Sequence, residues 1–464
     1  MRRMRRVLTI GLLAALAATG AGGCAILGAP TTAAPPADPT AFNQANSLAA
    51  GNLDGDGRPD AVAAVQGSAG KSIQIYGGLP GGSFTKTGAL LGKAADTARL
   101  ADMDADNRDD VVACCNESGF YVVRIYRKLA GGPVDDTTMT FGIPTSGCCT
   151  DIEVGDFVRN RPQGCGGPLG PACPDGPDVA VLYADGTVRV YSNVLNGQPP
   201  SLAATVPPPT PPSGRTWRPV GFADGASSSD LSEIAYAAND SAGENPTLVA
   251  IPPFDTGGTT AAAKFPITGA RSALAAGSGA VIRHGTTPCY TFLGATICDG
   301  VPRPSTFRTT LWAVSTVADD GKLAVSAFVP RDYPLLGWQT TPVPNQGADA
   351  TLGAPLLADL DGDDSDDVVV YSKRSGTGQD LLAMTGKLDA NGNGGTAFCG
   401  GNGTFGVNTS LPDPLQTGAR RVIADAGDLT GDGKRDVVAG PTVAAGSGAP
   451  LYRLANASVA GCPG

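Results

Sequence analysis

The sequence predicts an all-β fold built from repeated units, in which short acidic loops join short strands. Four segments place acidic residues at alternate positions, and each is followed by a short apolar run rich in β-branched residues. The chain has 65 Gly and 38 Pro among 464 residues, a composition that favours turns over long helices. Only 4 of its 43 acidic residues are Glu, which favours helices, whereas Asp favours turns and ligand loops.

The four acidic loops share one pattern of oxygen-bearing residues. Counted from the first of them, positions 1, 3, 5 and 9 carry oxygen-bearing side chains, and position 7 offers its backbone carbonyl. Alternate residues of a tight loop can turn their oxygens toward one centre, and this number of hard ligands suits calcium. Gly or Asn at position 6 of three loops tolerates a positive φ angle, at Gly57, Asn107 and Gly433.

The predicted calcium ligands fall into four sets, one for each loop. The first two sets are Asn52, Asp54, Asp56, Arg58 and Asp60, and Asp102, Asp104, Asp106, Arg108 and Asp110. The last two are Asp359, Asp361, Asp363, Ser365 and Asp367, and Asp428, Thr430, Asp432, Lys434 and Asp436.

These loops differ from EF-hands, which open in the same way. An EF-hand needs a bidentate Glu at position 12 and a helix on each side. Position 12 is occupied here by Ala63, Ala113, Val370 and Ala439, and the following runs are typical of buried strands. The sequence therefore predicts strand–loop–strand sites. The alternative is an Asx-rich turn without a metal, but four loops in the same register favour calcium.

The loops "GNLDGDGRPDAV" and "GDLTGDGKRDVV" resemble the calcium loops of FG-GAP/VCBS repeats. Such repeats build the β-propeller of integrin α subunits and of many bacterial secreted proteins. The upstream turns "GGLPGGSF" and "CGGNGTFG" resemble the Gly-rich turn and Phe that lead into the next loop. The resemblance covers residues 41–464 and implies a β-propeller with calcium loops between strands. Seven units of about 60 residues would fit seven blades of four-stranded antiparallel sheets.

The middle of the chain keeps the strands of the repeat and loses its acids. A third copy begins at Asp156 and is interrupted by the insertion Cys165–Cys173, after which Asp175 and Asp178 could complete a split ligand set. The fourth copy, at residues 220–237, has mostly Ser in its loop, and the fifth, at residues 273–285, has no acids. We expect no metal in the fourth and fifth copies.

A hairpin recurs after each of the first three loop strands. The segments "SIQIY", "VVRIY" and "TVRVY" end at Tyr76, Tyr126 and Tyr191. Tyr76 follows Asp60 by the same number of residues as Tyr126 follows Asp110. Equal offsets predict stacked hairpins of one design, and the alternative is unrelated hairpins in a β-sandwich.

The N-terminus is typical of an export signal. A basic "MRRMRR" precedes the apolar "VLTIGLLAALAATG", which predicts a signal peptide over residues 1–23. The following "AGGCAILG" resembles a bacterial lipobox with Cys24 as the lipidated residue, although Ala21 stands where Leu is usual. We expect residues 24–40 to form a disordered Pro/Ala tether. We expect a lipoprotein of the bacterial cell envelope, on the outer membrane or cell surface; the alternative is cleavage and secretion.

Cysteine usage also favours an oxidising compartment. Without Cys24 ten cysteines remain, an even number. Local closed loops are expected for Cys165 with Cys173 and for Cys289 with Cys298, and a tie at the chain end for Cys399 with Cys462. The adjacent pairs Cys114/Cys115 and Cys148/Cys149 can bridge to each other from opposite strand faces, or form vicinal bridges. A zinc site is disfavoured because no CxxC occurs and the chain has one His.

The sequence favours binding over catalysis. Triads and His-ligated metals need histidine, and only His284 exists. We expect a non-catalytic binding or adhesion module that holds calcium and acts as a monomer on an extracellular protein or glycan, with the membrane reached through the Cys24 anchor. The formal charge is −10 and no basic cluster follows the leader, so we expect no nucleic acid as a partner. The alternatives are a lyase-like polysaccharide enzyme on a propeller scaffold and a structural component of an envelope complex.

Overall fold

The computed structural model gives the placement of the strands and of two of the four acidic loops. It describes residues 45–67, 70–79, 83–91, 94–117, 120–127, 143–145, 149–159, 176–193, 200–211, 215–225, 234–251, 254–255, 262–284, 289–292, 295–298, 306–328, 338–343, 351–358, 367–373, 379–384, 386–387, 397–398, 409–410, 421–425, 435, 437–441 and 452–454. Every regular element in these ranges is a β-strand, which confirms the all-β prediction. None of them contains a helix long and apolar enough to cross a membrane.

The first three large sheets each have four antiparallel strands. The first consists of β1 (Ala45–Gly51), β2 (Asp60–Gly67), β3 (Gly70–Leu79) and β4 (Ser83–Leu91). The second consists of β5 (Ala94–Ala101), β6 (Asp110–Glu117), β7 (Phe120–Tyr126) and β8 (Ile143–Thr145). The third consists of β9 (Cys149–Gly155), β11 (Asp178–Tyr183), β12 (Val188–Ser192) and β13 (Ser201–Val206).

The recurrent tyrosine hairpin takes one register in these three sheets. Tyr76 lies opposite Ala61 in the first sheet, and Tyr126 lies opposite Val111 in the second. Tyr191 of the third sheet lies opposite Val179. Each partner is the residue that follows an aspartate at the start of a strand, so the prediction of hairpins of one design is confirmed.

The middle of the chain forms one eight-stranded sheet. Its first four strands are β14 (Trp217–Gly225), β15 (Ile234–Asp240), β16 (Thr247–Ile251) and β18 (Ala263–Pro266). The other four are β19 (Ala270–His284), β22 (Thr306–Ala318), β23 (Leu323–Phe328) and β24 (Gln339–Pro342). The two groups are joined by parallel pairing of β14 with β19, in which Ala223 pairs with Ala276. The sequence predicts separate four-stranded sheets here, but backbone pairing between β14 and β19 joins two of them into one sheet.

The remaining strands form smaller sheets and hairpins. One sheet contains β25 (Thr351–Leu352), β26 (Leu356–Ala358), β27 (Asp367–Lys373), β28 (Gln379–Met384) and β31 (Thr409–Ser410). The last contains β32 (Arg421–Asp425), β33 (Val437–Pro441) and β34 (Tyr452–Leu454). The two-stranded pairs are β10 (Val158–Arg159) with β17 (Phe254–Asp255), β20 (Cys289–Phe292) with β21 (Ala295–Cys298), and β29 (Gly386–Lys387) with β30 (Ala397–Phe398).

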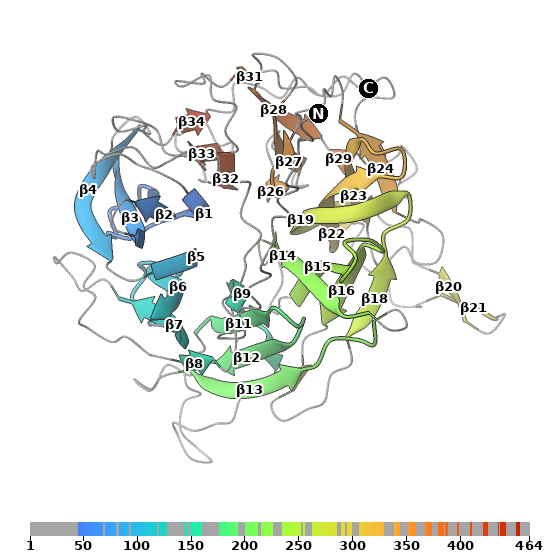
Figure 1. Ribbon diagram of the computed structural model, residues 1–464, viewed down its shortest axis with the longest axis horizontal. Coiled ribbons are helices and arrows are strands. Elements are labelled where there is room, and N and C mark those ends of the chain that lie inside the picture. The colour runs from blue at the N-terminus through green and yellow to red at the C-terminus, as the bar shows by residue number, and fades with distance from the viewer. Residues whose placement is uncertain are drawn as a thin grey trace, which may run out of the picture.

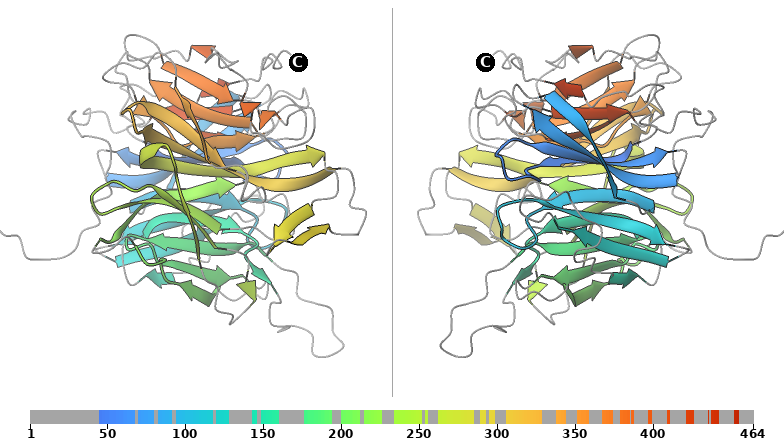
Figure 2. Two further views of the ribbon diagram at one scale, coloured as in Figure 1. Left: turned by 90° about the vertical axis from the view of Figure 1, so that its right-hand side faces the viewer. Right: turned by 90° about the vertical axis from the view of Figure 1, so that its left-hand side faces the viewer.

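The sheets are arranged in a ring (Figure 1). The strands that begin successive groups contact their neighbours in turn: β1, β5, β9, β14, β19, β26 and β32. β32 contacts β1, so the end of the chain meets its beginning and the ring closes. Figure 2, turned by 90°, shows the same ring edge-on. The described chain therefore has a propeller-like all-β fold.

The hydrophobic core lies between neighbouring sheets, and β6 shows why. Alternate residues of a strand face opposite sides of the sheet. Val111 and Ala113 of β6 pack against residues of the first sheet, whereas Val112 and Cys114 pack against the third. A strand buried on both faces needs apolar residues at every position, which explains the unbroken run of the sequence after the acidic loop.

One disulfide joins the second and third sheets, between Cys114 of β6 and Cys149 of β9. Of the two arrangements that the sequence left open, this excludes vicinal bridging of Cys114 with Cys115. The reason is the strand geometry, because Cys115 faces the first sheet and its Sγ lies 3.8 Å from the hydroxyl oxygen of Tyr126. Cys289 and Cys298 lie opposite each other across the β20–β21 hairpin. The remaining predicted partners lie outside the described residues: Cys148, Cys165, Cys173, Cys399 and Cys462.

A buried aspartate fixes the turn between β15 and β16. Asp240 accepts hydrogen bonds from the backbone N–H groups of Ala242 and Glu244 and from the side chains of Asn245 and Arg215. Burial acts to raise the pKa of Asp240, but these hydrogen bonds outweigh it and lower the pKa to about 2. The turn therefore depends on an ionised carboxylate.

Candidate metal centre

Two of the four acidic loops lie in the described part of the chain, and both join the first two strands of a sheet. Residues 52–60 connect β1 to β2, and residues 102–110 connect β5 to β6. We call them loop one and loop two. Position 2 of each loop is a buried apolar residue, Leu53 or Met103, which anchors the loop in the core between sheets. The predicted strand–loop–strand arrangement is confirmed for both loops.

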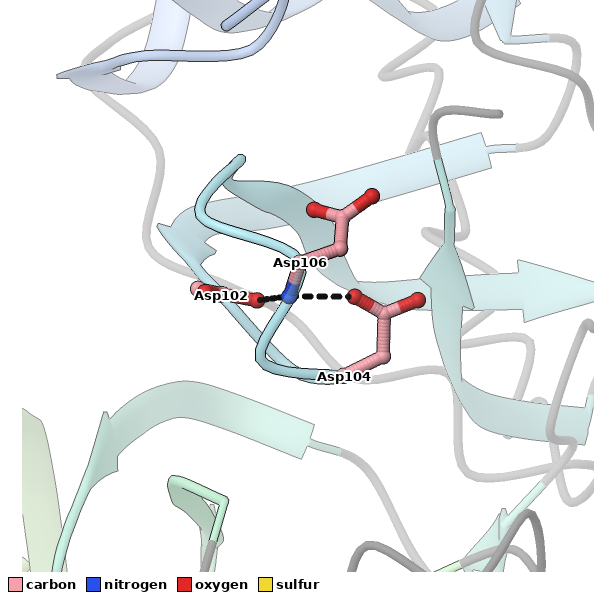
Figure 3. A group of neighbouring side chains, drawn as sticks. All are labelled: Asp102, Asp104 and Asp106. Carbon is pink, nitrogen blue, oxygen red and sulfur yellow. Dashed lines mark hydrogen bonds between the residues drawn. The ribbon is translucent and has the colours of Figure 1, made fainter. Parts of the chain in front are cut away.

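Loop two gathers three carboxylates. One oxygen each of Asp102, Asp104 and Asp106 lies within 4.8 Å of the others (Figure 3). The backbone N–H of Asp106 donates to Oδ1 of Asp102 at 3.0 Å and to Oδ1 of Asp104 at 3.3 Å. These bonds turn both side chains inward. The tight path also requires positive φ angles at Ala105 and Asn107, 59° and 65°, as the sequence predicts for Asn107.

The electrostatics of loop two favour a bound cation. Burial raises the pKa of Asp104, and the neighbouring charges of Asp106 and Asp102 act in the same direction, while Arg127 lowers it. Arg127 Nη1 lies 3.4 Å from Asp104 Oδ2, and Arg108 Nε lies 3.8 Å from Asp106 Oδ2, so two arginines partly offset three converging charges. Three carboxylates supply the hard oxygen ligands that calcium prefers, and the residues present therefore fit this ion.

Loop one has the same scaffold with a less convergent ligand set. Asn52 Oδ1 accepts a hydrogen bond from the backbone N–H of Gly55 at 2.9 Å, and Asp54 Oδ1 accepts one from Asp56 at 3.0 Å. The side chain of Arg58 pairs with the Asp56 carboxylate. A cation in loop one would compete with this arginine, and Asn52 supplies an amide where loop two supplies a carboxylate.

The aspartate at position 9 of each loop accepts backbone hydrogen bonds near the start of the loop, whereas the side chains at positions 1, 3 and 5 of loop two converge on one another. Asp60 accepts hydrogen bonds from the backbone N–H groups of Asp54 at 3.0 Å and of Gly78 at 2.8 Å. Asp110 accepts one from Met103 at 3.1 Å. Both aspartates are buried. The position-9 carboxylate thus holds the start of its loop to its own strand, and Asp110 is not a member of the converging group in loop two.

The third repeat also has a buried aspartate that holds the start of its loop, which we call a backbone clamp. Most of this loop lies outside the described residues. Asp178 is fully buried, and its Oδ2 accepts hydrogen bonds from the backbone N–H groups of Phe157 and Val158 at 3.0 and 3.1 Å. Its Oδ1 accepts one from the backbone N–H of Asn193 at 3.0 Å. Asp178 therefore acts here as a backbone clamp, and Asp175 is outside the described ranges.

Three residues that sequence reasoning missed hold the loops to one another or to other strands. Asp109 accepts a hydrogen bond from the backbone N–H of Asn52 at 2.6 Å, and burial raises the pKa of Asp109. Asn193 Nδ2 donates to the Met103 carbonyl at 2.8 Å, and Arg127 pairs with a loop-two carboxylate. The doubled aspartate of "NRDDVV" is the one signal that pointed to Asp109, because only its second Asp fits the ligand pattern.

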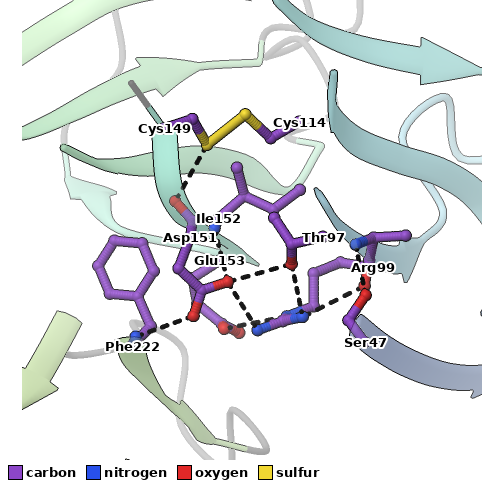
Figure 4. Close-up of polar contacts among 10 residues, drawn as sticks. Ser47, Thr97, Arg99, Cys114, Cys149, Asp151, Ile152, Glu153 and Phe222 are labelled. Carbon is purple, nitrogen blue, oxygen red and sulfur yellow. Dashed lines mark hydrogen bonds and ion pairs between the residues drawn. A yellow bond between two sulfur atoms is a disulfide. The ribbon is translucent and has the colours of Figure 1, made fainter. Parts of the chain in front are cut away.

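A separate polar network joins the first strands of successive sheets (Figure 4). Ser47 Oγ accepts a hydrogen bond from the backbone N–H of Ala98 at 2.8 Å. Arg99 Nη2 lies 3.2 Å from Asp151 Oδ1, and Asp151 Oδ2 accepts a hydrogen bond from the backbone N–H of Phe222 at 2.9 Å. Glu153 Oε2 also lies 3.5 Å from Arg99 Nε, so Arg99 offsets the charges of two carboxylates. These contacts link the first four groups of strands.

Several predicted site residues cannot be placed. The structure does not describe Cys24, the leader or the tether, nor the following loop residues: Asp359, Asp361, Asp363, Ser365, Asp428, Thr430, Asp432, Lys434 and Asp436. Asp367 begins β27, but its side chain is not described. The ligand sets of these two loops stay predictions.

Comparison with known proteins does not assign the chain to a family. No model of a protein family matches it, and no curated protein matches it. It is similar to the crystal structure of AofleA from Arthrobotrys oligospora, with 13% identity and a TM-score of 0.38 over 74% of this chain and 84% of that chain. It is also similar to the crystal structure of a protein from Lactobacillus plantarum, with 16% identity and a TM-score of 0.35 over 75% and 82% of the two chains. Neither similarity carries an argument about function.

Proposed function

We propose that the chain is a calcium-stabilised β-propeller of the FG-GAP/VCBS type that acts as a non-catalytic binding or adhesion module outside the cytoplasm. The observation that carries this proposal is the convergence of Asp102, Asp104 and Asp106 in a tight loop between two strands. Export follows from the leader at residues 1–23 and anchoring from lipidation of Cys24, both proposed from the sequence alone.

Seven blades are the proposed number of units. The sheets support it, because groups that begin at β1, β5, β9, β14, β19, β26 and β32 follow one another around the ring. The acidic loops of the sequence occur between the first two strands of a group. A metal there would brace the first two strands of a blade, which explains why the loops lie at equivalent places in the repeat.

The proposed affinity is modest. Neither described loop carries the bidentate Glu that strengthens an EF-hand, and extracellular calcium modules have dissociation constants of about 10⁻⁴–10⁻³ M. In loop two, three carboxylates and the carbonyl of Arg108 would hold the ion. Calcium would supply only charge neutralisation and bridging there, so its part in the proposed function is structural.

Equilibrium dialysis with radioactive calcium tests the metal proposal. The perturbing variant is Asp104→Asn, which removes one charge from the converging group at almost constant side-chain volume. The matched control is Asp185→Asn, at an exposed turn between β11 and β12 where Oδ1 accepts the backbone N–H of Thr187. We expect the wild type and the control to bind equal amounts of calcium and Asp104→Asn to bind less. Equal binding by all three proteins would remove loop two from the proposal.

A glycan array probed with and without calcium tests the adhesion role. Specific and reversible binding of a glycan, lost when calcium is chelated, is the expected result. Turnover of an acidic polysaccharide would favour the lyase-like alternative, and copurification with envelope proteins without a glycan signal would favour the structural alternative.

A further inference from the structure

Loop one and loop two contact each other directly. Asp109, at position 8 of loop two, accepts a hydrogen bond through Oδ2 from the backbone N–H of Asn52 at 2.6 Å. Its own backbone N–H donates to the carbonyl oxygen of Asn52 at 2.9 Å. Both backbone groups of Asn52, the first proposed ligand of loop one, are therefore held by one residue of loop two.

Two glycines make room for this contact: Gly51 at the end of β1 and Gly55 in loop one. A Cβ on Gly51 would collide with the carboxylate of Asp109. A Cβ on Gly55 would lie 3.1 Å from the side-chain carbons of Arg108, so the arginine at position 7 of loop two crosses the backbone of loop one. Positions 7 and 8 of loop two thus dock on positions 1 and 4 of loop one, with no side chain between them.

We propose that Asp109 is a positioning residue that couples cation binding in the two loops. This inference rests on the proposed calcium sites. Asp109 follows the proposed carbonyl ligand Arg108 and precedes Asp110, so fixing the backbone of loop two also fixes the Asp109 contacts to Asn52. Asn52 Oδ1 organises loop one by accepting the backbone N–H of Gly55. Occupation of loop two therefore prepares loop one for its ion.

The coupling is reciprocal and has a defined size. Energetic coupling between two sites changes each affinity by the same factor, typically about 5–150-fold. We expect the calcium affinity of loop one to fall at least about fivefold when the Asp109 contact is lost. The affinity of loop two should fall by the same factor, because the contact is shared.

Hydrogen–deuterium exchange during a calcium titration of the full chain measures each loop by itself. Peptides that cover residues 52–60 and 102–110 report loop one and loop two separately, whatever binds elsewhere. The variants are Asp109→Ala, which deletes the carboxylate, and Gly51→Ala, which displaces it from the opposite side. The control is Asp320→Ala, at an exposed turn between β22 and β23 where Oδ1 accepts the backbone N–H of Lys322.

The expected result is a shift of the loop-one midpoint to higher calcium in both Asp109→Ala and Gly51→Ala, with wild-type midpoints in the control. In Asp106→Asn, which weakens loop two directly, loop one should shift as well. Unchanged loop-one midpoints in folded Asp109→Ala and Gly51→Ala would overturn the coupling while leaving the calcium sites in place. Absence of calcium-dependent protection in either wild-type loop would instead overturn the proposed sites, and the coupling with them.

Discussion

Replacing Asp178 with alanine should destabilise the protein strongly and independently of calcium. Asp178 is fully buried and accepts three backbone hydrogen bonds, from Phe157, Val158 and Asn193, at 3.0 to 3.1 Å. The first two bonds hold the start of the third loop, and the last holds the end of β12. Alanine would leave these three donors without their acceptor in the packed region between sheets.

The expected loss follows from those three donors. A buried donor left without a partner costs about 1–3 kcal/mol. Even if water that enters the space reduces each cost to the lower value, Asp178→Ala should lower the free energy of unfolding by about 3 kcal/mol. The matched control is Asp185→Ala, since Asp185 is exposed and accepts a single N–H. Water can replace that bond, so the control should stay within about 0.5 kcal/mol of the wild type.

Urea unfolding followed by tryptophan fluorescence measures this difference, because Trp217 packs in the same hydrophobic cluster as Phe157. The midpoint should fall in Asp178→Ala at an unchanged m-value, and by the same amount with calcium and with chelator. A loss no larger than that of Asp185→Ala would refute the clamp. A loss seen only in the presence of calcium would identify Asp178 as a metal ligand instead.

Three further outcomes are expected. With calcium limiting, Asp106→Ala should lower the melting temperature more than Asp56→Ala, since loop two converges three carboxylates, and equal shifts in calorimetry would contradict this. The pKa of Asp240 falls from 3.8 to about 2 on folding, so its contribution to stability is present above pH 3.8 and is lost as the pH falls through about 2. Asp240→Asn should therefore flatten the plot of unfolding free energy against pH in this range. An unchanged plot would count against this role of Asp240. The disulfide between Cys114 and Cys149 should contribute about 2–4 kcal/mol to the free energy of unfolding. Cys114→Ala should therefore be less stable than the wild type in oxidising buffer and equal to it after reduction. Equal stability in both buffers would show that the disulfide makes no such contribution.

The sequence predicted the strands and the two described loops well because both follow local rules. Strands buried on both faces need unbroken apolar runs, which "DVVACC" shows plainly. The positive φ angles at Gly57 and Asn107 were predicted from the residue types that tolerate them. The equal spacing from Asp60 to Tyr76 and from Asp110 to Tyr126 predicted the same hairpin register in both sheets. Two hairpins with strands and turns of equal length place equivalent residues opposite each other.

Contacts between sheets were beyond sequence reasoning. Asp109 holds Asn52 across two sheets, and no local pattern links residues that distant in the chain. The role of position 9 also depends on burial, because Asp60 accepts a backbone N–H from Gly78 of the neighbouring strand. The parallel pairing of Ala223 with Ala276, which merges two groups into one sheet, joins residues far apart in the chain and has no local sequence pattern.

Anomalous diffraction from crystals grown with calcium tests the central claim most directly. The loop-two carboxylates of Asp102, Asp104 and Asp106 should surround an anomalous peak, with oxygens at about 2.3–2.6 Å from the ion. In that state Arg127 should have moved away from Asp104. A map without a peak at loop two, with Arg127 still paired to Asp104 at saturating calcium, would contradict the account.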